Sequence, residues 1–133
     1  MSTLKTNTLT GTTSAGSIVV TGEGGSTTTN LQQGLCKVWL NYDQTNDTTN
    51  DTFNVSSITD SSTGVFSAAF SNNMNNTTYT ASLSSTQAAN EATQAQYAVG
   101  TRATNSCAYD TENISSSNVD CPQNDSLIHG DLA

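Results

Sequence analysis

Between Gly34 and Leu83, short runs of alternating apolar and polar residues are separated by clusters of turn-forming residues. Alternation with a period of two is typical of a strand that buries one face. The clearest run places apolar or aromatic residues on a single face: Cys36, Val38, Leu40 and Tyr42. Several such runs at about a dozen residues apart predict an all-β fold, a small antiparallel β-sandwich or meander.

The two ends of the chain differ in their patterns. Residues 1–33 are low in complexity, with one short apolar run at Ile18–Val20 and a glycine cluster from Gly22 to Gly25. We expect these residues to form an extended arm that needs a neighbour to order it, followed by an antiparallel β-domain over residues 34–133. Three further strands are expected near the C-terminus, around residues 96–101, 106–109 and 126–129. The pattern leaves open whether residues 84–95 form a helix or a loop.

The composition argues against catalysis. Threonine, serine and asparagine occupy 57 of the 133 positions, whereas lysine and arginine together number three and histidine one. A catalytic site needs titratable groups with tuned neighbours, and this chain has few to arrange. The apolar share is only 33%, so the core of a monomer would be thin and a homo-oligomer would bury more surface. We therefore expect a non-enzymatic, self-associating protein without a cofactor.

The net charge of −8 limits which kinds of molecule this chain can bind. Nucleic acid and anionic membrane surfaces repel such a chain, so neither is an expected partner. No apolar run reaches the roughly 20 residues that cross a membrane. The first ten residues lack the apolar core of a secretory signal, which predicts synthesis in a cytoplasm and release by another route, such as lysis.

Two patterns could suggest a chemical site, but neither is specific. Asp43, Asp47 and Asp51 recur every four residues, yet they lack the glycine turn and closing glutamate of a calcium-binding loop. We interpret them as a solvated acidic loop and expect no metal site. His129, the only histidine, follows the apolar pair Leu127 and Ile128, and we expect it to end a terminal strand rather than to act in catalysis.

The three cysteines have no metal-ligand spacing. Cys36 lies in an apolar run and is expected to be a small buried side chain. Cys107 and Cys121 lie in one loop-rich region and could close a disulfide, which would contribute about 3 kcal/mol if formed. Cytoplasmic synthesis favours the alternative, two unrelated free thiols.

Several apolar and aromatic residues are candidates for contacts with a partner. In the arm and the first strand of the β-domain, we expect contacts to an oligomer partner or to a larger particle at Leu4, Leu9, Ile18, Val19, Val20 and Trp39. Trp39 and the tyrosines could instead form a platform that stacks on sugars, or they could pack in the core.

Three stretches of the chain resemble a known family: MSTLKTNTLTGTTSAG, then GEGGSTTTNLQQGLCKVW leading into DTFNVSSITDSSTG, and the closing IHGDLA. They are similar to small virion structural proteins of marine bacteriophages, notably cyanophages, described as tail-fibre or other appendage proteins. The likeness covers most of the chain and is weakest over residues 84–123.

The resemblance implies a non-enzymatic particle component, a homotrimer, made in the host cytoplasm and extracellular after lysis. The arm would attach to other virion proteins or to sister chains, and the β-domain would project outward. The stretch that departs most from the family is residues 103–123, whose candidates for facing a host receptor are Tyr109, Asp110 and Glu112. Two alternatives stay open: a capsid (head) decoration or head-fibre protein, and a glycan-binding host-adhesion module.

Overall fold

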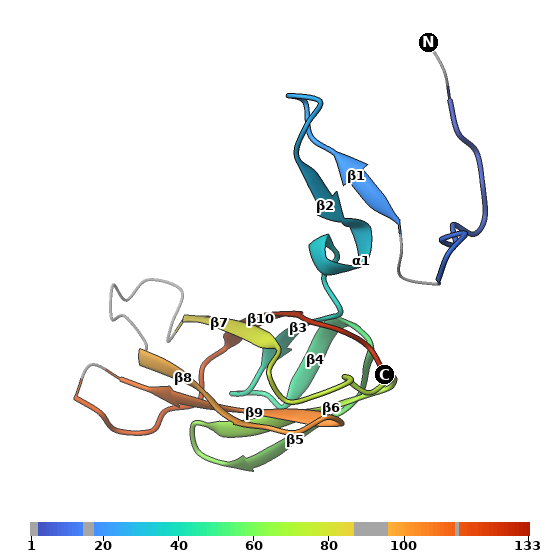
Figure 1. The fold of residues 1–133 in the computed structure, drawn as a ribbon. Coiled ribbons are helices and arrows are strands. Elements are labelled where there is room, and N and C mark those ends of the chain that lie inside the picture. Colours follow the sequence, from blue (N-terminus) through green and yellow to red (C-terminus); the bar gives the residue numbers. More distant parts are fainter. Residues whose placement is uncertain (1–2, 15–17, 87–95, 114) are drawn as a thin grey trace. The chain divides into compact units, whose positions relative to one another are not determined.

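The computed structural model describes residues 3–14, 18–86, 96–113 and 115–133, without the side chains of residues 96–98. It is an all-β structure in which two four-stranded antiparallel sheets pack as a sandwich (Figure 1). Sheet I has the order β4-β3-β10-β7, with β3 (Val38–Asp43), β4 (Thr48–Phe53), β7 (Thr80–Thr86) and β10 (Gln123–His129). Sheet II has the order β5-β6-β9-β8, with β5 (Val55–Ser62), β6 (Val65–Phe70), β8 (Gln96–Arg102) and β9 (Ser106–Glu112). The sandwich predicted from alternation is confirmed.

The strands bury alternate residues, as the period of two requires. In β3 the inward residues Val38, Leu40 and Tyr42 are at most 2% exposed. Strands β6, β9 and β10 alternate in the same way. The inward residues of both sheets form one core that contains Phe66, Tyr109 and Ile128.

The centre of the core is a stack of three aromatic rings. Phe66 of sheet II lies 5.0 Å from Tyr109 and 5.1 Å from Tyr42 of sheet I, measured between ring centroids. A second pair, Phe70 and Tyr79, meets edge to face at 6.1 Å. Such contacts add about 0.5–1.5 kcal/mol each beyond the burial of area. The stack therefore joins the two sheets.

A single residue carries the chain from sheet I to sheet II. Asn54, with a φ of 59°, follows β4 and precedes β5. Its amide nitrogen donates to the carbonyls of Lys37 and Asn72, both at 3.1 Å, and its side-chain oxygen accepts from the backbone N–H of Asn72 at 2.7 Å. Phe53 and Val55 therefore belong to different strands and different sheets, because the chain turns between them.

The chain divides into two compact units, Met1–Leu35 and Cys36–Ala133. Within the first unit, β1 (Val19–Thr21) and β2 (Thr28–Asn30) form an antiparallel hairpin, and α1 (Leu31–Gly34) is a single helical turn. The turn of the hairpin is closed by the Gly22 N–H, which donates to the Thr27 carbonyl at 2.8 Å. The side chain of Asn30 accepts from the Gln33 N–H at 3.2 Å and caps the helical turn. The apolar run at Ile18–Val20 overlaps β1, whereas no sequence pattern indicated its partner β2.

The C-terminal strands predicted from sequence are confirmed as β8, β9 and β10. The segment over residues 84–95 is described only to Thr86, where β7 ends, and residues 87–95 lie outside the described residues.

One end of the sandwich is closed around Gly64, in the turn between β5 and β6. Gly64 has a φ of 71°, a conformation that L side chains rarely adopt. Its N–H donates to the Asp120 carboxylate and its carbonyl accepts from the Thr111 N–H, both at 2.7 Å. A Cβ at this position would meet the Thr111 carbonyl oxygen at 2.4 Å and the Val119 nitrogen at 2.7 Å. The close packing requires glycine.

We therefore predict that Gly64→Ala lowers the free energy of unfolding by about 1–3 kcal/mol or more, from backbone strain and the clash with Thr111. Gly24→Ala is the control, because a Cβ there meets nothing within 4 Å. Chemical denaturation followed by tryptophan fluorescence measures both. Equal stability of the Gly64 variant and the wild type would contradict the assigned packing.

Candidate functional site

Three large apolar side chains lie in register across the outer face of sheet I. Trp39 of β3 is the direct partner of Phe53 in β4 and of Leu127 in β10. Directly paired residues of antiparallel strands place their side chains on the same face. Phe53 and Leu127 are each 51% exposed, and Trp39 is half-buried. We call Phe53, Trp39 and Leu127 the apolar row.

A polar row crosses the same face beside the apolar row. The Asn50 amide donates to the Asn41 side-chain oxygen at 2.6 Å, and the Asn41 amide donates to Asp125. The other carboxylate oxygen of Asp125 accepts from the Gln123 amide at 2.8 Å. This chain of hydrogen bonds holds the polar groups in place and leaves carboxylate lone pairs able to accept further donors.

The first unit exposes the apolar residues that sequence analysis selected. Leu4, Leu9, Val19 and Val20 are at least 50% exposed, and Ile18 is half-buried. None of the described residues of this unit is buried. A short hairpin without a core is marginally stable by itself, so these side chains remain candidates for contact with a partner.

The structure does not place the three proposed receptor-facing residues, Tyr109, Asp110 and Glu112, on one surface. Tyr109 is fully buried in the aromatic stack, so it cannot face a receptor. Asp110 and Glu112 are half-buried, and Asp110 lies opposite Val65 on the outer face of sheet II. The alternation of β9 explains the correction, because Tyr109 and its acidic neighbours must point to opposite sides.

The three cysteines are free thiols, so the Cys107–Cys121 disulfide considered from sequence is not formed. Cys107 lies four residues before Thr111 on β9, about 13 Å along the strand. The Cys121 thiol interacts with the Thr111 side chain, and a disulfide requires Cα atoms within about 7 Å. Cys36 is half-buried rather than buried, with its sulfur 3.0 Å from the Val38 carbonyl oxygen.

The acidic residues of the β3–β4 turn have structural roles. The Asp43 carboxylate accepts from the backbone and side-chain amides of Asn46, at 3.0 and 2.8 Å. Asp47 accepts from the Tyr42 hydroxyl at 2.7 Å, and Asp51 accepts from the Thr52 N–H at 2.8 Å. Among the described residues, no group of three or more His, Cys, Asp or Glu side chains is placed to hold a metal ion.

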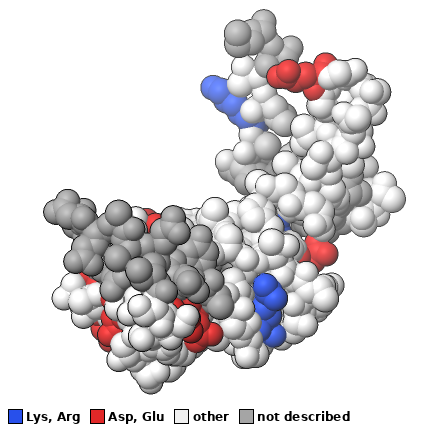
Figure 2. All heavy atoms as spheres, turned by 90° about the vertical axis from the view of Figure 1, so that its left-hand side faces the viewer, with Lys and Arg blue, Asp and Glu red and all other residues white. Residues whose placement is uncertain are grey.

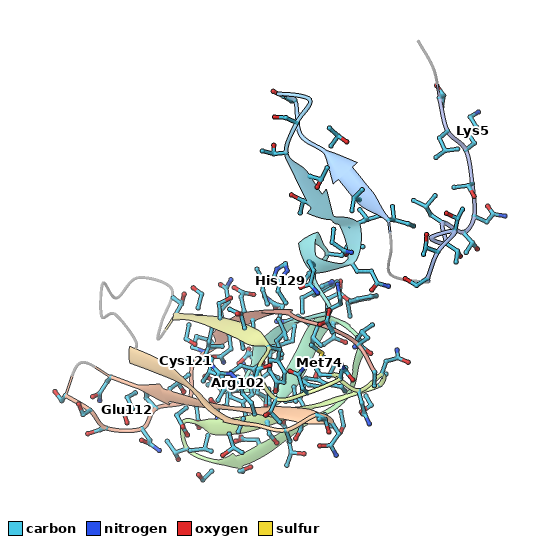
Figure 3. All side chains as sticks on the ribbon, viewed as in Figure 1. Lys5, Met74, Arg102, Glu112, Cys121 and His129 are labelled. Carbon is cyan, nitrogen blue, oxygen red and sulfur yellow. The ribbon has the colours of Figure 1, made fainter. Side chains whose placement is uncertain are left out.

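His129 ends β10, as expected, and its exposed side chain projects from sheet I (Figure 3). Charged atoms are sparse over much of the face that Figure 2 shows. In the described part of the chain, no helix is long and apolar enough to cross a membrane.

The buried hydroxyl and thiol groups are held protonated. Burial raises the pKa of Tyr109 above its ordinary value of 10.0, and burial raises that of Cys107 above 9.0. Burial also raises the pKa of Tyr42, and its hydrogen bond to Asp47 raises it further. These groups serve packing, because a nucleophile or general base needs a pKa nearer to neutrality.

Comparison with known proteins does not indicate a function, so the candidate site is the main evidence for one. No family model matches the chain, and neither a curated protein nor a solved structure matches it. The arrangement on the outer face of sheet I is suited to binding, since it places the half-buried Trp39 and the exposed Phe53 beside ordered polar groups.

Sequence analysis found Trp39 but missed Phe53 and Leu127, the neighbours that turn a single side chain into a row. Both were assigned to strands, and the missing information was the pairing register that places them beside Trp39.

We predict that one thiol of the native protein, Cys36, reacts with a thiol reagent in aqueous buffer. Cys107 and Cys121 are fully buried and have raised pKa values because of burial, so they react only when the structure opens. All three thiols react in denaturant. A protein that shows only one reactive thiol in denaturant without reductant contains a disulfide and contradicts this assignment.

We also predict that the free energy of unfolding falls above about pH 9. The unfolded chain releases thiol and phenol protons at the ordinary pKa values of 9.0 and 10.0, whereas the folded chain retains them. Each such proton contributes a slope of about 1.4 kcal/mol per pH unit. Denaturation curves at a series of pH values measure the slope, which Tyr109→Phe reduces above about pH 10. An unchanged slope in that variant would show that Tyr109 ionises freely when folded.

Proposed function

We propose that this chain is a non-enzymatic structural protein of a bacteriophage virion, a short tail-fibre or appendage component exposed on the particle. The observation that carries the proposal is that apolar side chains are exposed in both units. They lie on the first unit, at residues such as Val19 and Val20, and along the apolar row. Clustered exposed apolar side chains mark contact surfaces. The resemblance of three sequence stretches to virion proteins supplies the kind of partner.

The use of the polar residues supports a non-enzymatic role. The carboxylates of the β3–β4 turn accept hydrogen bonds from neighbouring amides and from Tyr42. The surface chemistry is that of hydroxyl and amide groups, which suit solubility outside the cell.

In this proposal the first unit attaches the chain to other virion proteins or to sister copies, and the sandwich is displayed. The protein works as a homo-oligomer. It assembles in the host cytoplasm and is extracellular after lysis. Attachment to the capsid instead of the tail would make the same chain a head-decoration or head-fibre protein.

A second candidate function, recognition of a host glycan, is favoured by one observation. Trp39 and Phe53 are adjacent on the outer face of sheet I, beside the ordered groups of Asn41 and Asp125. Aromatic rings can stack on the apolar faces of sugars while amides and carboxylates bind hydroxyl groups. The tyrosines considered from sequence do not contribute, since Tyr42, Tyr79 and Tyr109 are buried and the side chain of Tyr97 lies outside the description.

We predict that the chain is found on purified phage particles by mass spectrometry, and at the tail by cryo-electron microscopy. Val19→Ser combined with Val20→Ser should lower the copies per particle several-fold, because the first unit, which attaches the chain, loses two exposed apolar side chains. Trp39→Ala combined with Phe53→Ala is the control, since both residues belong to the displayed sandwich and their loss should leave the copy number unchanged.

Density on the capsid shell would assign the alternative, a decoration protein. Normal copy number with weakened adsorption to host cells would favour the glycan-binding role. Absence of the chain from the particle would refute the virion proposal.

A further inference from the structure

The four end strands of the two sheets are not equally protected against pairing with another chain. Strand β4 has a register shift where Tyr42 pairs with Thr49 and carries Asp51, β5 has two shifts and carries Asp60, and β8 has a shift before Arg102. Bulges and charges are the usual devices that block an exposed edge. Strand β7, the remaining end strand of sheet I (Figure 1), pairs with β10 without a shift from Thr80 to Thr86 and contains neither charge nor proline.

The hydrogen bonds of β10 show which backbone groups of β7 face outward. The Lys37 N–H donates to the Ile128 carbonyl at 2.8 Å, so Ile128 faces β3 and its neighbour Leu127 faces β7. Ser82, the partner of Leu127, therefore points its backbone groups toward β10, and its carbonyl also accepts from the Ser126 hydroxyl at 2.7 Å.

The alternate residues Ala81, Leu83 and Ser85 consequently present their N–H and C=O groups to the free edge. Among the described residues, no backbone group outside sheet I pairs with this edge. An edge that is regular, uncharged and without a backbone partner among the described residues is a template for a further strand.

The sequence of β7 is nearly the same in both directions. It reads Thr-Ala-Ser-Leu-Ser-Ser-Thr, and the reverse differs only by the exchange of Ala81 and Ser85. Two antiparallel copies centred on Leu83 would place Thr80 opposite Thr86 and Ser82 opposite Ser84. These hydroxyl pairs are favourable across strands.

We propose that β7 is the self-association strand of this protein: two copies pair their β7 edges antiparallel about a two-fold axis at Leu83. Each Leu83 exchanges hydrogen bonds with its counterpart, and Ala81 exchanges them with Ser85 of the second copy. The two copies of sheet I then form one continuous sheet. This contact is isologous, and it does not depend on where the protein works.

The oligomeric mass of the full chain, measured by light scattering over a concentration series, tests the proposal. The wild type should reach twice the chain mass of 13.8 kDa. Ser82→Lys with Ser84→Lys places lysines opposite each other and should raise the dissociation constant about tenfold or more. The matched control is Ser57→Lys with Thr59→Lys, at the same spacing on exposed positions of β5.

A crosslinking experiment keeps the test independent of any loss of folding. Ser82 and Ser84 of opposite copies form a non-hydrogen-bonded pair, whose Cα separation of about 4.5 Å permits a disulfide. A mixture of Ser82→Cys and Ser84→Cys chains should give a covalent dimer under mild oxidation at higher yield than either chain alone. A monomeric or trimeric wild type, a dimer unaffected by the lysines, or no preferential crosslink would each overturn the proposal.

Discussion

The contact of three aromatic rings across the two sheets is the interaction on which the rest of the structure depends. The chain has few large apolar residues to form a core, and two tyrosines supply much of its volume beside Phe66. A buried tyrosine needs a partner for its hydroxyl group. Tyr42 donates to Asp47, and the Tyr109 hydroxyl lies 2.9 Å from the Ser126 hydroxyl. The hydrogen bonds at the margins of the core follow from this use of tyrosine.

The small number of large apolar residues also explains why the ends of the sandwich are polar. Where apolar residues run out, Thr111, Gln44 and Asn124 are buried with hydrogen-bond partners from several loops. Buried polar groups that are fully partnered fix one arrangement, since a partner lost is costly. Gly64 belongs to this closed end, where no side chain can be accommodated.

The outer faces differ in what they offer to a partner. Sheet I has the apolar row on its face and, at one side, an edge strand without a bulge or charge. These are separate surfaces, so one can serve contacts to other molecules while the other serves self-association. The first unit adds exposed apolar residues with no core of their own. A protein built in this way presents surfaces for contact, and the buried tyrosines and the acids of the β3–β4 turn contribute to packing and turns.

Alternation and turn chemistry by themselves determined the all-β class and most strands. The reason is that the period of two is a local property of the sequence, visible at residues such as Val38, Leu40 and Tyr42. The acidic residues of the β3–β4 turn could also be located from sequence. Pairing register was not, because it depends on residues far apart in the chain. Only the tertiary structure placed Phe53 and Leu127 beside Trp39, buried Tyr109, and separated Cys107 from Cys121. Local sequence sets which residues share a face, but packing of the sheets decides which face is covered.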